Sequence, residues 1–91
     1  MIIRSQNKCV IENLEETESI FIKEANWNKY DIVTDKRLLG TYSTNGSAVK
    51  VMDMICDSYQ YLQECKYTGI GVSQPEFVFQ MPQDSEVWRN D

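Results

Sequence analysis

The hydrophobic pattern of the chain changes its period near residue 43, and this change limits the possible folds more than any other feature. After Ser43, apolar side chains recur every three or four residues, which is the spacing of one face of an α-helix. These residues are Ala48, Val51, Met52, Ile55, Tyr59 and Leu62. Ser43 is a suitable N-cap for a helix that begins near Thr44, and Gly69 and Gly71 are expected to end it. Before Ser43, apolar and polar residues alternate, which indicates β-strands.

The strand-forming stretches suggest a simple sheet. Residues 2–3 and 9–12 predict a hairpin whose turn gives Asn7 a positive φ. Further strands are expected at 19–24, 27–34, 37–42 and 77–81. We predict an α+β fold, an antiparallel β-meander of four to five strands with one amphipathic helix packed on one face. Residues 1–83 would form a single domain, and 84–91 a polar C-terminal tail.

Length and cysteine content favour a soluble cytoplasmic protein of one domain. A chain of 91 residues supports a single core, and no window approaches the roughly 18 apolar residues of a membrane span. Three widely spaced cysteines do not resemble a disulfide framework. We expect Cys9 and Cys56 to be buried as small hydrophobic residues. Cys56 and Cys65 would lie on opposite sides of the helix, which excludes a shared structural zinc.

The charge balance argues against direct binding to nucleic acid. Nine basic residues stand against fourteen acidic ones, for a net charge of −5. Binding to phosphates requires clustered Lys and Arg, whereas the basic residues here are scattered and only Lys36 and Arg37 are adjacent.

Acidic residues, in contrast, gather in two places. The stretch IENLEETES at 11–19 holds Glu12, Glu15, Glu16 and Glu18. Asp53, Asp57 and Glu64 line the polar side of the predicted helix, and no basic residue occurs from Val51 to Cys65. These surfaces are either merely solvated or form a binding face for a basic partner. Trp88, among polar neighbours, is either an exposed interface anchor or folds back on the sheet.

The residue types present leave little room for catalysis. Without histidine, the chain lacks the commonest general base and metal ligand. The glycines of TGIGVS at 68–73 follow the predicted helix, so no helix N-terminus faces a phosphate there. Asp53 and Asp57, one turn apart, could share an ion through water, but a solvated helix face is the simpler interpretation. We therefore predict no enzyme activity, no metal and no cofactor.

Three phrases together resemble a known group of proteins. They are MIIRSQNK at 1–8, GTYSTNGSAVKVMDMI at 40–55 and FVFQMPQDSEV at 77–87. The group consists of small, uncharacterised prophage and conjugative-element proteins of low-GC Gram-positive bacteria, which open with the Arg-Ser-Gln phrase and close with the Phe-Gln-Met-Pro phrase. This chain departs from them at Asn45 and Gly46, where the group carries Glu-Glu or Glu-Lys. The resemblance covers most of the chain and implies a mobile-element context in a bacterial cytoplasm, without any particular chemistry.

Two functions of different classes follow. The first is a non-catalytic protein-binding accessory protein of a phage or mobile element, an acidic inhibitor of a host defence nuclease similar in size and charge to small anti-CRISPR proteins. Reversal of Glu15, Glu16 and Glu18 to Lys should then abolish binding to the basic partner. The alternative is an oligomer that binds a nucleotide signal between subunits. Its binding residues would be Arg4, Trp27, Lys29, Tyr30 and Arg37. Pairing of two copies through a sheet edge is a third option, so monomer and homodimer both remain open.

Overall fold

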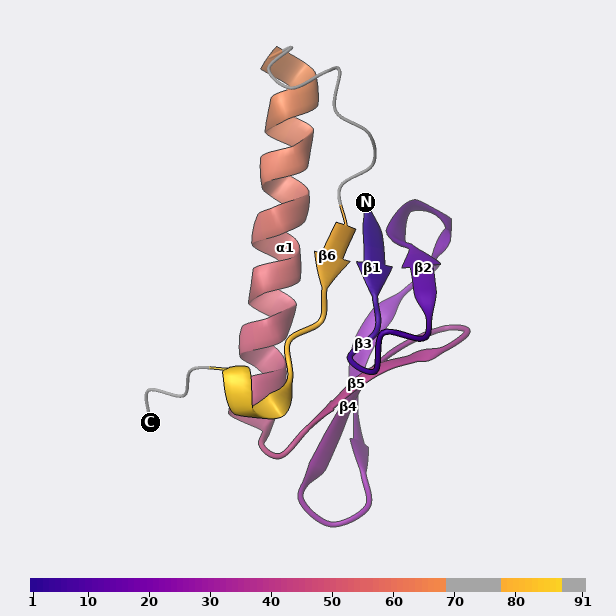
Figure 1. The fold of residues 1–91 in the computed structure, drawn as a ribbon, viewed down its shortest axis with the longest axis vertical. Helices are drawn as coiled ribbons and strands as arrows, with labels where there is room; N and C mark the ends of the chain where they lie inside the picture. Colours follow the sequence, from indigo (N-terminus) through magenta and orange to yellow (C-terminus); the bar gives the residue numbers. More distant parts are fainter. Residues whose placement is uncertain (69–77, 88–91) are drawn as a thin grey trace.

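A short three-stranded sheet brings the two ends of the described chain together. The computed structural model describes residues 1–68 and 78–87. In this sheet β1 (Ile2–Arg4) lies between β2 (Ile11–Asn13) and β6 (Val78–Gln80). Strand β1 pairs antiparallel with β2 and parallel with β6 (Figure 1). The parallel neighbour comes from the far end of the sequence, so hairpin signals could not predict it.

A second three-stranded sheet forms the meander. It consists of β3 (Ile20–Ala25), β4 (Lys29–Thr34) and β5 (Leu38–Tyr42), paired antiparallel in sequence order. The α+β class is confirmed, but the single meander of four to five strands is wrong: the described residues form six strands in two sheets. A 3-10 helix, η1 (Leu14–Glu16), stands between β2 and β3 and is capped by the Asn13 side chain. This helix interrupts the extended chain, so β3 starts a new sheet.

The turn between β1 and β2 is built around a side chain. The expected hairpin is confirmed, but Lys8, with φ 67°, takes the left-handed conformation in place of Asn7. The Oδ1 atom of Asn7 accepts hydrogen bonds from the Ser5 hydroxyl at 2.6 Å and the Cys9 amide at 3.0 Å. Asn7 therefore braces the turn, and the strained position falls on the next residue.

The β3–β4 hairpin carries the most exposed large side chain of the described residues. Ala25 pairs with Lys29, which leaves residues 26–28 as a three-residue loop. Trp27 therefore occupies the hairpin tip, 92% exposed with φ 32°, and Asn28 follows with φ 59°. The expectation that Trp27 begins a strand is wrong, because the alternating pattern starts at Lys29. Figure 1 shows this tip below the start of the helix.

The helix α1 (Asn45–Thr68) confirms the apolar stripe and shifts its predicted start by one residue. The Thr44 hydroxyl accepts a hydrogen bond from the Ser47 amide at 3.0 Å, so Thr44 is the N-cap instead of Ser43. Ala48, Val51 and Ile55 are buried. The other predicted members of the stripe pack partly against the core: Met52, Tyr59 and Leu62. Gly69 and Gly71 lie outside the described residues.

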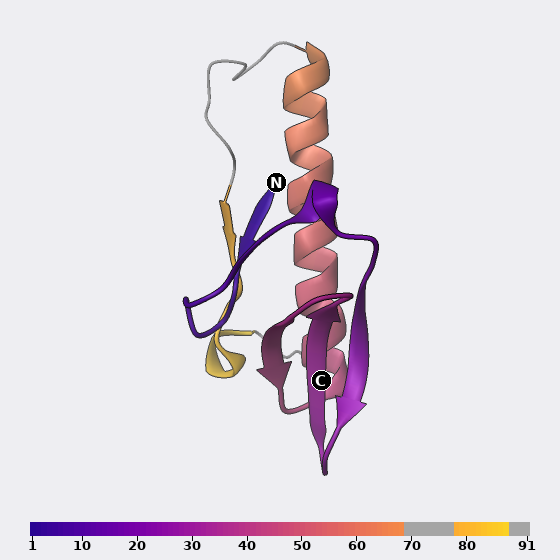
Figure 2. The ribbon, with the colours of Figure 1, turned by 90° about the vertical axis from the view of Figure 1, so that its right-hand side faces the viewer.

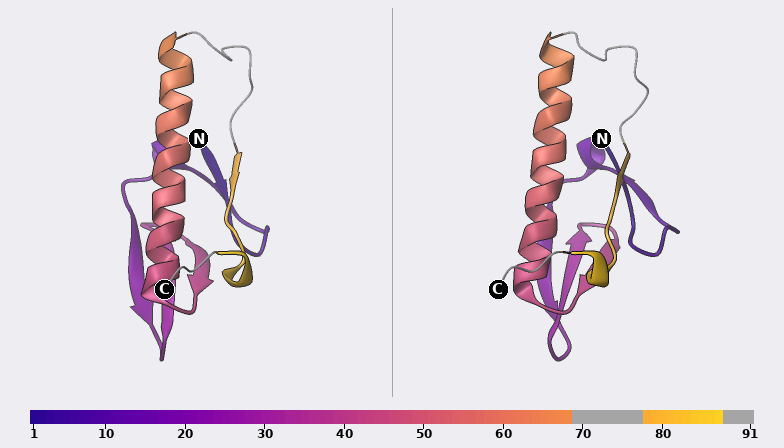
Figure 3. Two further views of the ribbon diagram at one scale, coloured as in Figure 1. Left: turned by 90° about the vertical axis from the view of Figure 1, so that its left-hand side faces the viewer. Right: turned by 60° about the vertical axis from the view of Figure 1, so that its left-hand side comes forward.

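The core forms where both sheets meet one side of α1. The helix packs mainly against β4 and β5, and Figures 2 and 3 show both sheets on the same side of its axis. Ile3 and Phe79 come from the first sheet, whereas Ile32, Leu39 and Tyr42 come from the second.

Two further expectations about burial are corrected. The predicted tail begins with a 3-10 helix, η2 (Asp84–Glu86), and Val87 after it is buried in the core. Cys9 and Cys56 are both exposed, so the prediction of buried cysteines is wrong. Cys9 lies in the β1–β2 turn, and Cys56 falls outside the apolar stripe of α1. Trp88 and the side chain of Cys65 lie outside the described residues.

Candidate functional site

Gln6 joins the two sheets. Its backbone N–H donates to the Leu39 carbonyl at 2.7 Å. Its side chain accepts from the Thr41 amide at 2.9 Å and donates to the Thr41 carbonyl at 3.1 Å. One residue thus pairs with the free edge of β5 much as a short strand would. We call Gln6 with Leu39 and Thr41 the Gln6 joint.

The C-terminal phrase closes on the same place. The Met81 amide donates to the Arg4 carbonyl at 3.0 Å, and the Gln83 side chain donates to the Gln6 carbonyl at 2.7 Å. The Gln80 side chain donates to the Ser5 carbonyl at 2.9 Å. The segments MIIRSQNK and FVFQMPQDSEV are therefore hydrogen-bonded to each other, and the side chains of Gln80 and Gln83 provide two of these bonds.

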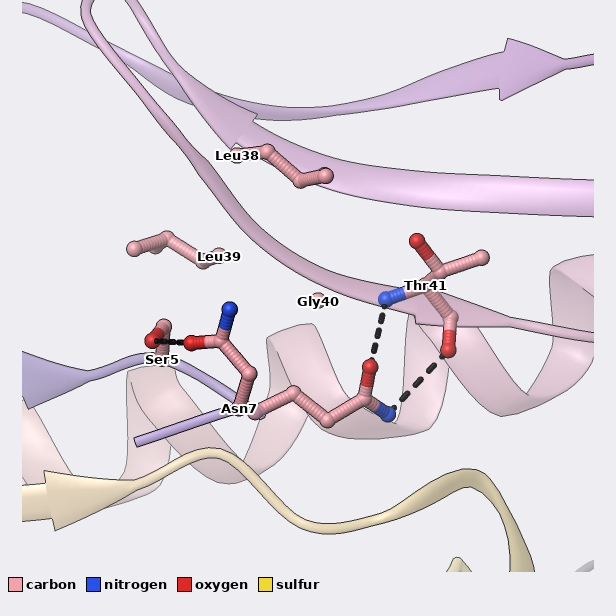
Figure 4. Close-up of a pocket in the computed structure, with 7 residues that line it drawn as sticks. Ser5, Asn7, Leu38, Leu39, Gly40 and Thr41 are labelled. Atoms are coloured by element: carbon pink, nitrogen blue, oxygen red, sulfur yellow. Dashed lines mark hydrogen bonds between the residues drawn. The ribbon is translucent and has the colours of Figure 1, made fainter. Parts of the chain in front are cut away.

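A hollow of about 200 Å³ lies beside the Gln6 joint (Figure 4). Ser5, Gln6 and Asn7 form one wall, and residues 38–41 of β5 form the other. The two dashed lines that reach Thr41 in Figure 4 are the hydrogen bonds of Gln6. Among the described residues, no ionisable side chain lines this hollow, and its polar groups largely bond to one another. The described lining therefore provides neither a general base nor a charged anchor for a nucleotide.

The four glutamates predicted at residues 12–18 do not form one free surface. The Glu12 carboxylate is 12% exposed, with Oε1 3.6 Å from Nε of Arg37. Glu15 Oε1 lies 3.6 Å from the amino group of Met1. Only Glu16, at the end of η1, and Glu18 are exposed without a described ion pair. Local positive charge thus offsets much of the charge that the sequence places in this connection.

The acidic residues of the helix fall together on its outer side. Asp53, Asp57 and Glu64 are separated by four and seven residues, so at about 100° per residue they share one face. All three are exposed. Met54, 39% exposed, and Tyr61, 62% exposed, flank them on one side. We call Asp53, Met54, Asp57, Tyr61 and Glu64 the acidic helix face.

The two acidic regions point to different surroundings. Figure 1 places α1 along one side of the molecule and the β2–β3 connection on the opposite side, with β1 and β6 between them. A single small partner site would not span both. Trp88, the remaining predicted contact, lies outside the described residues.

The residues considered for a nucleotide site are also dispersed within one copy of the chain. Trp27 and Lys29 belong to the β3–β4 hairpin tip, whereas Arg37 lies in the turn at the other end of β4, beside Glu12. Arg4 is exposed on the first sheet, and Tyr30 packs partly against the core. In the described part of one copy of the chain, these cationic side chains therefore do not form a cluster that could bind a phosphate.

No group of three His, Cys, Asp or Glu side chains in the described chain is arranged to hold a metal ion. Burial, and then the nearby carboxylates of Asp84 and Glu86, raise the pKa of the Tyr42 phenol well above its ordinary value. Its hydroxyl donates to the Pro82 carbonyl at 2.7 Å, so it acts as a structural donor.

Two features escaped sequence reasoning. Gln6 is a single polar residue in a turn, and the partners of its side chain lie 35 or more positions away, so no local pattern marks it. Trp27 could have been assigned to a tip from its neighbours, because Asn26 and Asn28 are typical turn residues on both sides of it.

None of the helices in the part of the chain that the structure describes has both the length and the apolar character of a membrane span. Comparison with protein-family models, with curated proteins and with solved structures finds no match to this chain.

Proposed function

We propose that this protein is a non-catalytic protein-binding accessory protein that presents the acidic helix face to a basic partner. The observation that carries this proposal is the composition of that face. Asp53, Asp57 and Glu64 are exposed together, the sequence between Val51 and Cys65 contains no Lys or Arg, and Lys50 lies one turn before Asp53. Such a field attracts a positively charged protein surface and repels nucleic acid.

The same face also has apolar contact groups. Surface carboxylates mainly raise the association rate, whereas the dissociation rate depends on side chains that become buried in the interface. Met54 and Tyr61 are exposed beside the carboxylates and can serve as such anchors. The combination supports a specific interface better than the β2–β3 connection does, because Glu12 and Glu15 already have positive neighbours there.

The partner class follows from charge complementarity and from the family resemblance. A surface lined with Lys and Arg is typical of a nucleic-acid channel. From the resemblance to prophage and conjugative-element proteins we infer that this channel belongs to a host defence nuclease. The proposed protein would occupy the channel with carboxylates where phosphates otherwise bind, and so inhibit the nuclease in the bacterial cytoplasm.

A pair of charge-reversal variants separates the two acidic regions. Asp53→Lys with Asp57→Lys changes the net charge from −5 to −1, since each reversal adds two charges. Glu16→Lys with Glu18→Lys makes the same change on the opposite side of the molecule and is the matched control. All four residues are exposed, so both variants should keep the stability of the wild type within about 0.5 kcal/mol.

Tagged protein is incubated with bacterial lysate and then washed in parallel at low and at high salt. The retained proteins are identified and purified, and the Kd of each for the wild type and for each variant is measured by titration. We expect a nucleic-acid-binding protein that is released at high salt. Its Kd should rise by at least about tenfold with the helix variant and change little with the control. An equal loss of affinity with both variants would mean that binding depends only on the net charge of the protein and not on the acidic helix face. A retained partner without a basic channel would exclude the nuclease assignment.

A further inference from the structure

The first two residues of α1, Asn45 and Gly46, form the one place in the sequence where a glycine follows an asparagine. The side-chain carboxamide of an asparagine can react with the amide nitrogen of the next residue, and the side chain of that next residue hinders the approach. Every other asparagine in the sequence is followed by Lys, Leu, Trp or Asp. This steric barrier is therefore missing at Asn45 alone.

The structure leaves both reacting groups of this pair accessible. Asn45 and Gly46 are exposed. Within the described residues, neither the Asn45 carboxamide nor the Gly46 amide makes a hydrogen bond. The next two amides are engaged, since Ser47 donates to the Thr44 hydroxyl and Ala48 to the Thr44 carbonyl. A helix has no carbonyl partner for its first amides, so the Gly46 nitrogen remains available for reaction.

We propose that Asn45 is a site of spontaneous deamidation. The Gly46 amide loses its proton to solvent base, and its nitrogen attacks Cγ of Asn45. The new N–Cγ bond closes a succinimide ring, the Cγ–Nδ2 bond breaks, and Nδ2 takes a proton from solvent and leaves as ammonia. Water then adds to one of the two ring carbonyls. Cleavage of the N–Cγ bond gives aspartate, whereas cleavage of the backbone C–N bond gives isoaspartate, in which the chain continues through Cγ.

The helical conformation controls how often this ring can close. A helical ψ at Asn45 directs the Gly46 nitrogen along the helix axis, whereas the side chain of Asn45 points outward from it. Ring closure therefore requires the first turn of α1 to open. The Thr44 hydroxyl holds this turn through its hydrogen bond from the Ser47 amide at 3.0 Å, so the strength of the cap sets the rate of deamidation.

The two products change the start of the helix in opposite directions. The first turn contains no acidic residue, so an aspartate there places a negative charge at the positive end of the helix dipole and stabilises the turn. Isoaspartate adds one carbon to the backbone between Thr44 and Ser47 and so displaces the capped amide. This inference is independent of the proposed function, because Asn45 is not part of the acidic helix face.

Incubation in heavy-oxygen water tests the site. Folded protein is kept in mildly alkaline buffer made with this water, and its peptides are analysed by mass spectrometry over time. Oxygen that enters during the incubation carries the label, which separates the reaction from deamidation during digestion. We expect labelled product at Asn45 well before Asn28, which is also exposed but precedes Lys29. Protein unfolded in urea is the positive control, because no helix opposes ring closure there.

Gly46→Ala tests the mechanism. An added Cβ at this position would meet only the Thr44 hydroxyl oxygen, at 3.8 Å, so the variant should fold as the wild type does. It should slow the labelling of Asn45 by at least about tenfold, because the methyl group hinders the attack. Equal rates at Asn45 and Asn28, a rate that Gly46→Ala leaves unchanged, or a folded protein that stays unlabelled after the unfolded control has reacted would overturn the proposal.

Two destabilised variants test the role of the cap. Thr44→Ala weakens the first turn and should raise the labelling rate at Asn45 at least about threefold. Ile3→Val is the control, because it removes one methyl group from the buried core of the first sheet and costs a comparable global stability without touching the cap. It should leave the rate within about twofold. An equal or larger effect of Ile3→Val would mean that the reaction requires global unfolding and would overturn the role of the cap.

Discussion

Tyr42 shows how a single side chain ties the C-terminal segment to the meander sheet. Its ring lies against Gly40, where an added Cβ would come within 3.2 Å of two of its atoms and within 3.3 Å of the Met81 methyl group. Its hydroxyl reaches the Pro82 carbonyl, which also accepts from the Gln6 side chain at 3.2 Å. Glycine at position 40 therefore provides the space for this contact, and the phenol must remain protonated to make it.

We expect the stability of the protein to fall at alkaline pH partly through Tyr42. Its pKa is raised in the folded state, so the unfolded chain loses this proton first, near the ordinary value of 10.0. The contribution is fully present below that pH and is lost as the pH rises above it. Urea unfolding at several pH values, for wild type and Tyr42→Phe, should show a steeper decline for the wild type above about pH 10.

The variant is a fair comparison because Pro82 keeps its hydrogen bond from Gln6. Every other residue is the same in the two proteins, so its contribution cancels in the difference. Identical slopes would mean that Tyr42 ionises as freely in the fold as in the unfolded chain.

At the scale of the element, the first turn of α1 depends on a hydroxyl one residue later than the sequence suggested. Thr44 accepts the Ser47 amide, and its hydroxyl also donates to the Ser47 hydroxyl at 3.0 Å. Ser43 contributes its own amide to Asp84, which links the start of α1 to η2. The N-cap, Thr44, and the tertiary contact, Ser43, therefore occupy neighbouring positions. The sequence alone does not indicate which of the two hydroxyl groups caps the helix.

Thr44→Ala should lower the free energy of unfolding by about 1 kcal/mol, because it leaves an amide of the first turn without its cap. Asn45→Ala, at the exposed first residue of the helix, is the matched control and should change the free energy of unfolding by less than about 0.5 kcal/mol. Urea denaturation of both variants measures the difference. Equal losses with the two variants would mean that the Thr44 hydroxyl does not cap the helix.

What the sequence could predict follows from the range of each interaction. The stripe of α1 and the hairpins are local, so spacing and turn residues identified them. The parallel pairing of β1 with β6 joins residues about 75 positions apart in the sequence, and no periodic pattern indicates it. For the candidate site, the acidic helix face followed from helical spacing. The neutralisation of Glu12 by Arg37 did not, because it depends on how the two sheets meet.

At the scale of the whole molecule, residues from both ends of the described chain complete a single core. Phe79 of β6 stands beside Ile3 of β1, and Met81 and Val87 follow it into the interior. The first sheet has only three residues in each strand. The stability of this sheet must therefore come chiefly from the burial of its inward-facing apolar side chains, and less from the hydrogen bonds between its strands.

Phe79→Ala should destabilise the protein by about 3 kcal/mol or more, because a buried aromatic ring is replaced by a cavity. Val78→Ala, on the exposed side of the same strand, should cost less than about 1 kcal/mol. Chemical denaturation of the two variants checks this. Equal and small losses would indicate that β6 contributes little to the core.

The Gln6 joint has a consequence for how large an assembly can become. A sheet with two bare edges can add strand after strand and grow into a fibre. Here one glutamine occupies the β5 edge, so a molecule that adds a neighbour through β3 has no second such edge on that sheet to offer. The side chain that connects the two sheets therefore also closes one edge of the meander sheet to pairing with another strand.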